Sequence, residues 1–193
     1  MNGDRAVFRL GTAEVSVYQA DTFFPLMSTE TATVEDSEFL NITPKKIAAG
    51  AVGGFVGSLI MGVLMQTMNP GTLQMGIPAM YGIEEPSLGV GWAFHQWHGV
   101  FLGVVYVLGA ENIDALRGKA RSLGGAVGLG VGYGIATTLL PVFVMPLWLS
   151  AMGFAGAPPF PNFAIPATLM SAMTHIIYAV PLALVYYFVV RSE

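Results

Sequence analysis

The sequence predicts an all-α membrane protein with four transmembrane helices, and three observations support this fold class. Of its 193 residues, 54% are hydrophobic and only 10% are charged, whereas soluble domains carry about 25% charged residues. Four apolar segments are each long enough to cross a bilayer, which takes roughly 20 residues. None of the four contains Asp, Glu, Lys or Arg, and they run from about 47 to 68, 88 to 110, 123 to 147 and 167 to 190.

The composition also excludes several classes of function. The chain contains no Cys, which excludes disulfides, thiolate zinc sites, iron–sulfur clusters and cysteine nucleophiles. Its net charge of −4 argues against nucleic acid as a partner. No carboxylate lies inside an apolar segment, so a general acid–base pair within the membrane is not expected. The sequence therefore predicts no catalytic activity of its own.

Residues 1–43 form a polar tail that we expect to be mostly irregular. Apolar and polar residues alternate on both sides of Gly11-Thr12, which predicts a small hairpin. The stretch 28–38 is rich in Ser, Thr and acids and is expected to be loop. Thr43 followed by Pro44 is typical of a helix start, with Thr43 as N-cap. A transmembrane domain of residues 44–193 follows.

The basic residues predict the orientation of the spans. They occur before the first span, between the second and third spans, and after the fourth: Lys45, Lys46, Arg117, Lys119, Arg121 and Arg191. The other two loops, about 69–87 and 148–166, contain no Lys or Arg. The positive-inside rule therefore places both termini and the central loop in the cytoplasm. We expect a multi-pass protein of the cell (inner) membrane.

The two halves of this domain look like a repeat, about 47–110 and 123–190. Two spans carry the spacing i, i+4, i+8, i+11, which is one helix face: His95, Gly99, Gly103 and Tyr106 match His175, Ala179, Ala183 and Tyr186. Each half goes out and back. We therefore expect two parallel helical hairpins related by a pseudo-two-fold axis along the membrane normal.

Small residues recur every fourth position in the first and third spans. In lipid, helix association relies on close backbone approach, which small residues permit. The two predicted packing ladders make these spans the centre of the bundle, and their members are Gly50, Gly54, Ser58 and Gly62, then Gly124, Gly128, Gly132 and Ala136.

The intramembrane histidines are the candidate ligand-binding residues. His95 and His175 occupy equivalent positions in the two halves and hence one depth, and His98 lies one turn from His95. Such a pair could hold a metal or haem iron, or hydrogen-bond a quinone, with Tyr106 and Tyr186 closing the cytoplasmic side. The alternative is structural, with each imidazole bonded to backbone or hydroxyl groups.

The order of helices and small residues resembles the YagU-like small four-helix inner-membrane proteins and similar archaeal four-helix proteins. The resemblance rests on the Gly-rich opening helix 50–65, on His98-Gly99 leading into 101–106, and on the Pro-rich run 141–161 followed by His175. It covers roughly residues 47–190. Because that family has no established activity, the resemblance implies topology rather than chemistry.

Taken together, these observations favour a non-catalytic integral membrane subunit of a larger complex, of respiratory or other energy-transducing type. Its expected partners are other membrane-protein subunits and lipid, with no nucleic acid. The alternative is a stand-alone binder of haem, quinone, metal or another small apolar ligand through the histidines. A small transporter is the third hypothesis.

Overall fold

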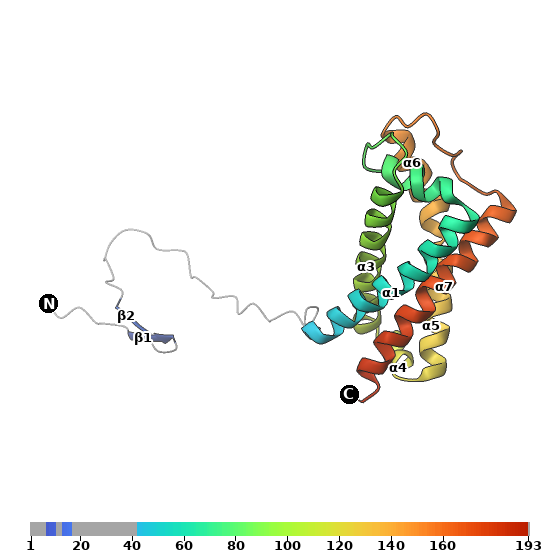
Figure 1. The fold of residues 1–193 in the computed structure, drawn as a ribbon. Helices are drawn as coiled ribbons and strands as arrows, with labels where there is room; N and C mark the ends of the chain where they lie inside the picture. Colours follow the sequence, from blue (N-terminus) through green and yellow to red (C-terminus); the bar gives the residue numbers. More distant parts are fainter. Residues whose placement is uncertain (1–6, 11–12, 17–41, 193) are drawn as a thin grey trace, which may run out of the picture. The chain divides into compact units, whose positions relative to one another are not determined.

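The computed structural model describes residues 7–10, 13–16 and 42–192 (Figure 1). The chain divides into two units, Met1–Ser37 and Glu38–Glu193. In the first, strands β1 (Val7–Leu10) and β2 (Ala13–Ser16) pair antiparallel, with Leu10 opposite Ala13. This hairpin lies where the alternating sequence predicts one. The predicted loop 28–38 lies outside the described residues.

The second unit is helical throughout its regular structure. Its long helices are α1 (Pro44–Met68), α3 (Leu88–Asn112), α5 (Leu123–Thr137) and α7 (Ile165–Val190). Shorter helices are α2 (Ile77–Ala79), α4 (Asp114–Ala120) and α6 (Met145–Ala151), and Thr72–Gly76 and Leu140–Val144 are π-helical turns. Helix α1 starts as predicted, with Thr43 at the N-cap in an extended conformation and Pro44 in the first turn.

Three helical segments are long and apolar enough to cross a membrane, namely α1, the α5–α6 segment Leu123–Ala151, and α7. Helices α3 and α4 form a fourth candidate if the pair, which bends by 109°, is counted as one span. The outer half of α3 contains His95, Gln96 and His98, which lower its mean hydropathy. These helices are consistent with a multi-pass membrane protein.

Helices α1 and α7 form the centre of the bundle. Helix α1 packs along both α3 and α7, and α5 packs along α7 (Figure 1). Helices α3 and α5 meet through side chains, because the Tyr133 hydroxyl donates to the carbonyl of Leu102 at 2.7 Å. The prediction that the first and third spans make the centre is therefore wrong for the third span, which is α5. A two-fold axis that exchanges the halves would exchange α1 with α5 and α3 with α7. It would therefore require α3 and α5 to pack as closely as α1 and α7, whereas α3 and α5 meet through side chains.

Helix α1 meets both neighbours through glycines. A Cβ at Gly50 would lie 2.6 Å from the carbonyl oxygen of Gly103 on α3, and a Cβ at Gly53 would lie 2.9 Å from that of Leu182 on α7. Neither position has room for a side chain, so the backbones are in direct contact. All four members of the ladder predicted on this helix are buried against α3: Gly50, Gly54, Ser58 and Gly62.

Helix α5 uses a different face from the one that its sequence suggests. Its buried residues include Ala126, Gly130 and Gly134, and a Cβ at Gly130 would lie 2.8 Å from the Cα of Val180 on α7. The predicted ladder of Gly124, Gly128 and Gly132 is exposed, and among the described residues a Cβ at any of the three would meet no other helix within 4 Å. At 3.6 residues per turn, positions two apart lie about 200° apart around a helix. The sequence therefore offers two opposite small faces, and the tertiary structure packs the other one.

The end of the bundle that contains α2 and α6 has helical structure where the sequence predicts two loops. The π-helical turn and α2 lie within the segment predicted as the first outer loop, and Leu73 there is fully buried. The indole of Trp148 on α6 donates to the carbonyl of Met80 at 2.7 Å. Pro141 and Pro146 accompany the break between α5 and α6, as kinking prolines do. The two hairpins are thus joined at this end as well.

Substitutions on the two faces of α5 test this packing. Gly130→Leu should lower the free energy of unfolding by about 1–3 kcal/mol, because the side chain would have to displace the α7 backbone. Gly128→Leu is the matched control. Both substitutions raise the helix propensity of α5 equally, but only Gly130→Leu places a side chain in the space of the α7 backbone. Thermal unfolding of the purified chain in mild detergent measures both. Equal midpoints for the two variants would contradict the assignment of the buried face.

Candidate functional site in the bundle interior

His95 joins α3 to α1. Its ring is buried, with 6% of the residue exposed, and its Nε2 lies 2.9 Å from the carbonyl oxygen of Ser58. The ring of Trp92 contacts it edge-on, and the Trp92 indole donates to the Gln66 side chain at 2.8 Å. A Cβ at Gly62 would overlap Trp92, so the glycine makes room for this pair. His95 therefore acts as a hydrogen-bonded link between two spans.

Ser58 and Gln96 extend this link by one polar contact. The Ser58 hydroxyl lies 2.9 Å from the carbonyl oxygen of Phe55 and also bonds the Gln96 side-chain amide. A hydroxyl has one proton to donate, so donation to Phe55 requires the Gln96 amide nitrogen to face Ser58. With its carbonyl oxygen towards Ser58, the side chain of Gln96 would bury its Nε2 without a hydrogen-bond partner in the described part of the chain. When the Gln96 amide nitrogen faces Ser58, the carbonyl oxygen of the same side chain occupies the buried position in place of Nε2.

His98 lies on a different side of α3, towards the outer loop. Its Nε2 is 2.6 Å from the hydroxyl of Tyr81, and the Tyr81 ring stacks on Phe94 with 3.7 Å between centroids. Partial burial raises the pKa of Tyr81 above its ordinary value, so the phenol keeps its proton and can donate it to His98. This histidine thus fastens the segment after α2 to α3.

His175 bonds within its own helix. Its Nδ1 lies 2.8 Å from the carbonyl oxygen of Ser171, one turn earlier on α7. Among the described residues, no hydrogen bond or ring contact joins His95 to His175, and no three His, Asp or Glu side chains lie close enough to hold a metal ion. Each of the two imidazoles bonds a main-chain carbonyl, which is the structural role that the sequence analysis named beside ligand binding.

Four tyrosines of α3, α5 and α7 lie in the bundle interior, namely Tyr106, Tyr133, Tyr178 and Tyr186. The Tyr178 hydroxyl donates to the Gly99 carbonyl at 2.8 Å, crossing from α7 to α3. The Tyr178 side chain lies beside Gly57 on α1, where a Cβ would overlap the Tyr178 backbone and ring. With the bond from Tyr133 to α3, two tyrosines on different helices donate to main-chain oxygens of the same helix. These bonds hold α3 against the rest of the bundle.

Tyr106 and Tyr186, the candidates predicted to close the histidine site, contact each other. Their rings meet edge-on with 5.8 Å between centroids, and Tyr106 also contacts Tyr133 at 5.3 Å. The Tyr186 hydroxyl bonds a carboxylate oxygen of Glu111. The buried Tyr106 hydroxyl has no hydrogen-bond partner among the described residues. Tyr106 therefore packs among the interior tyrosines, and Tyr186 links them to Glu111 at the end of α3.

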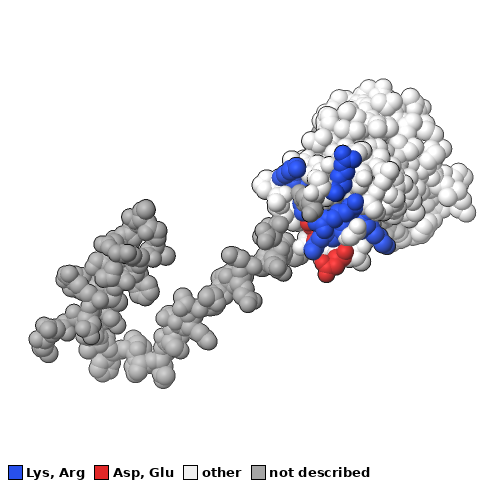
Figure 2. All heavy atoms as spheres, turned by 90° about the horizontal axis from the view of Figure 1, so that it is seen from below, with Lys and Arg blue, Asp and Glu red and all other residues white. Residues whose placement is uncertain are grey.

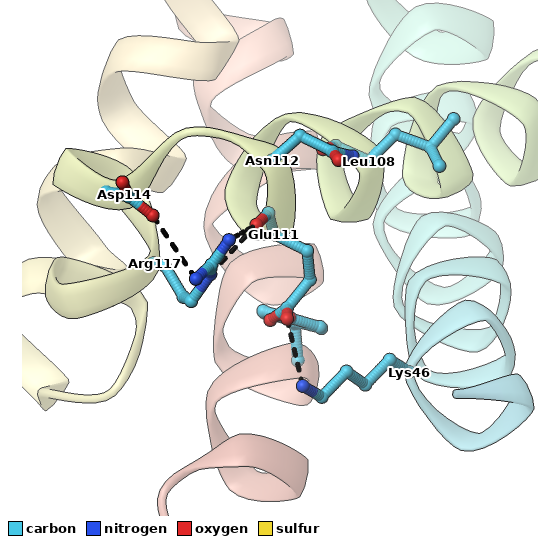
Figure 3. Close-up of polar contacts among 7 residues, drawn as sticks. Lys46, Leu108, Glu111, Asn112, Asp114 and Arg117 are labelled. Carbon is cyan, nitrogen blue, oxygen red and sulfur yellow. Dashed lines mark hydrogen bonds and ion pairs between the residues drawn. The ribbon is translucent and has the colours of Figure 1, made fainter. Parts of the chain in front are cut away.

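Glu111 forms the polar tie at the end of the bundle where α3 finishes. Lys46 on α1 donates to its carboxylate at 2.9 Å, and the two side chains are only 10% and 11% exposed. Arg117 on α4 donates from Nε to the Glu111 carbonyl at 2.8 Å and pairs with Asp114 at 3.2 Å (Figure 3). With Tyr186, these contacts bring α1, α3, α4 and α7 to one residue.

Sequence reasoning missed Glu111, Tyr133 and Tyr178. Glu111 follows directly after an apolar segment, where an acid is ordinarily solvated and needs no partner. One signal could have found it. Glu111 follows the second apolar segment and Lys46 precedes the first, so the predicted topology places this acid and this base on the same side. The two tyrosines carried no signal, because phenols also suit lipid interfaces.

In residues 42–192 the interior polar side chains therefore form a set of hydrogen-bonded links between helices. A comparison with protein-family models, curated proteins and solved structures finds no match to this chain. The resemblance to YagU-like proteins accordingly stays a prediction.

Replacing Glu111 tests the tie. Glu111→Gln should cost about 3 kcal/mol of unfolding free energy, because it removes the carboxylate charge that pairs with the buried ammonium of Lys46. Asp114→Asn is the control, since that carboxylate is 93% exposed and exposed pairs contribute about 0–1 kcal/mol. Chemical unfolding in micelles measures the difference. The double change Lys46→Met with Glu111→Leu should cost less than Glu111→Gln alone, and the opposite order would show that the pair does not hold the helices.

Proposed function

We propose that the chain is a non-catalytic integral membrane subunit that docks against another membrane helix through the outward face of α5. This face consists of Gly124, Gly128, Gly132 and Ala136, and we call it the α5 stripe. Each member is exposed in the isolated chain. The stripe is the single observation that carries the proposal.

The rest of the protein shows what such a stripe is suited to do. The glycines on α1 at positions 50, 53, 54 and 57, and those on α5 at positions 130 and 134, each face another helix backbone closely. Close backbone approach is the main source of helix association in lipid. Small residues thus form three packed faces: α1 against α3, α1 against α7, and α5 against α7. The α5 stripe is a fourth face with the same four-residue spacing, and it favours packing against a partner helix for the same reason.

Ordinary lipid-facing surfaces of this bundle have a different composition. The exposed side of α1 carries large apolar side chains, including Val52, Phe55 and Val63. On α5, the large residues Val127 and Ile135 flank the stripe and are also exposed. They form ridges beside a row of small residues, which matches the surface of a packed helix pair better than a surface that only contacts acyl chains.

The charge distribution supports an orientation for this subunit. The loop between α3 and α5 and both ends of the helical unit carry the Lys and Arg residues, while the other two loops carry none. The positive-inside rule then favours a protein of the cell membrane with the ends of α1 and α7 that carry Lys45 and Arg191 in the cytoplasm.

Disturbing the stripe should release the chain from its complex. Gly128→Leu should shift the protein, extracted from native membranes in mild detergent, from a large species on native gels to the mass of the single chain. The matched control is Gly109→Leu on α3, where a Cβ also meets nothing within 4 Å. A wild-type protein that already migrates alone, or equal behaviour of the two variants, would refute the proposal.

The orientation has its own test in whole cells. Cys introduced at Gly118, in α4, should resist a membrane-impermeant thiol reagent until the cells are opened, whereas Cys at Ser87, before α3, should react at once. The chain has no native Cys, so labelling reports only the introduced site. Labelling of Gly118→Cys in intact cells would reverse the assignment.

A further inference from the structure

The Lys and Arg side chains of the helical unit gather at one end of the bundle. Figure 2 shows them together on this face, and we call them the basic end: Lys45, Lys46, Arg117, Lys119, Arg121 and Arg191. The opposite loops contain Glu84 and Glu85 and no base. Two acids, Glu111 and Asp114, lie among the six bases. Within residues 42–192 the basic end therefore carries six bases and two acids, a net four positive charges.

The two acids are already committed to two of the cations. Glu111 pairs with the buried Lys46, and Asp114 pairs with Arg117. The other four cations, Lys45, Lys119, Arg121 and Arg191, have no carboxylate within ion-pair distance in residues 42–192. All four are exposed. They are available to an anion from outside the chain.

Helix α4 places part of this charge at the depth of lipid headgroups. It turns by 109° from α3, so if α3 follows the membrane normal, α4 runs close to the membrane plane. Ala120 is buried in the core cluster that also contains Val190 of α7, while Lys119 and Arg121 on either side of it are exposed. Ile113 and Leu123, which bracket α4, are 50% and 54% exposed. A cationic helix bordered by exposed apolar residues is suited to the membrane interface.

Arg191 repeats this combination at the end of α7. Its guanidinium lies 5.0 Å from the ring centroid of Phe188 and 5.9 Å from that of Tyr187. Phe188 is itself 56% exposed, so on a spanning helix it faces acyl chains. The cation is thereby held at the edge of the apolar surface, where phosphate groups lie.

We propose that the basic end binds the headgroup phosphates of anionic phospholipids through Lys45, Lys119, Arg121 and Arg191. Exposed apolar residues beside the cations distinguish a lipid from a soluble acidic partner, because an acyl chain would cover them and a polyanion would not. Each Lys or Arg near an anionic bilayer surface raises the affinity of a protein for that surface about fivefold at low salt.

The test measures phosphatidylglycerol on the purified full-length chain. Native mass spectrometry should show phosphatidylglycerol retained in preference to phosphatidylcholine when both are offered in mixed micelles. Lys119→Gln with Arg121→Gln should lower that retention by about 25-fold, from two cations at about fivefold each. The matched control, Glu84→Gln with Glu85→Gln, should leave it unchanged, and unaltered thermal midpoints in phosphatidylcholine show that each variant is folded.

Three results would overturn the proposal. One is equal retention of the two lipids by the wild-type chain. Another is retention of phosphatidylglycerol by the Lys119/Arg121 variant at the wild-type level. The third is soluble polyglutamate that displaces phosphatidylglycerol from the wild-type chain at equal charge concentration, which would identify the basic end as a surface for an acidic protein.

Discussion

Direct backbone contact at the glycines of α1 is the constraint on which the rest of the bundle depends. In lipid, apolar surface gains little by moving from acyl chains to a neighbouring helix, so van der Waals contact and hydrogen bonds must supply the association energy. Gly50 and Gly54 admit α3 on one side, and Gly53 and Gly57 admit α7 on the other. Close approach also brings side chains of α7 within reach of α3, and the bond from Tyr178 to the Gly99 carbonyl is made across that gap.

Polar groups inside the bundle follow from the same constraint. A buried donor or acceptor without a partner is costly where water cannot reach it. His95 and Tyr133 accordingly bond main-chain oxygens of a neighbouring helix, whereas His175 bonds its own. These groups fix the rotation of each helix about its axis, which packing of glycines alone would leave loosely defined. The Glu111 tie then sets the level of the helices along the membrane normal, because an ion pair at the span ends tolerates little axial sliding.

The surfaces that remain after this packing differ in chemistry. Large apolar residues cover the outside of α1, small residues form the α5 stripe, and cations surround α4 and the end of α7. Acyl chains, a partner helix and phosphate groups are the natural neighbours of these three surfaces in turn. A protein whose interior polar groups link its own helices can act through its exterior, which is consistent with the proposed role in assembly.

The sequence by itself determined the helical class, the four apolar segments, the start of α1 at Thr43 and Pro44, and the ladder on α1, because length, hydropathy and small-residue spacing are local properties. It could not determine which face of α5 is buried, since Gly128 and Gly130 lie on opposite sides of one helix and both sides are small. It also could not decide whether His95 and His175 meet, because equal depth in two spans says nothing about rotation towards each other. Those choices, like the partnership of Lys46 with Glu111, are made only when helices far apart in sequence come into contact and each polar group finds the nearest oxygen or charge.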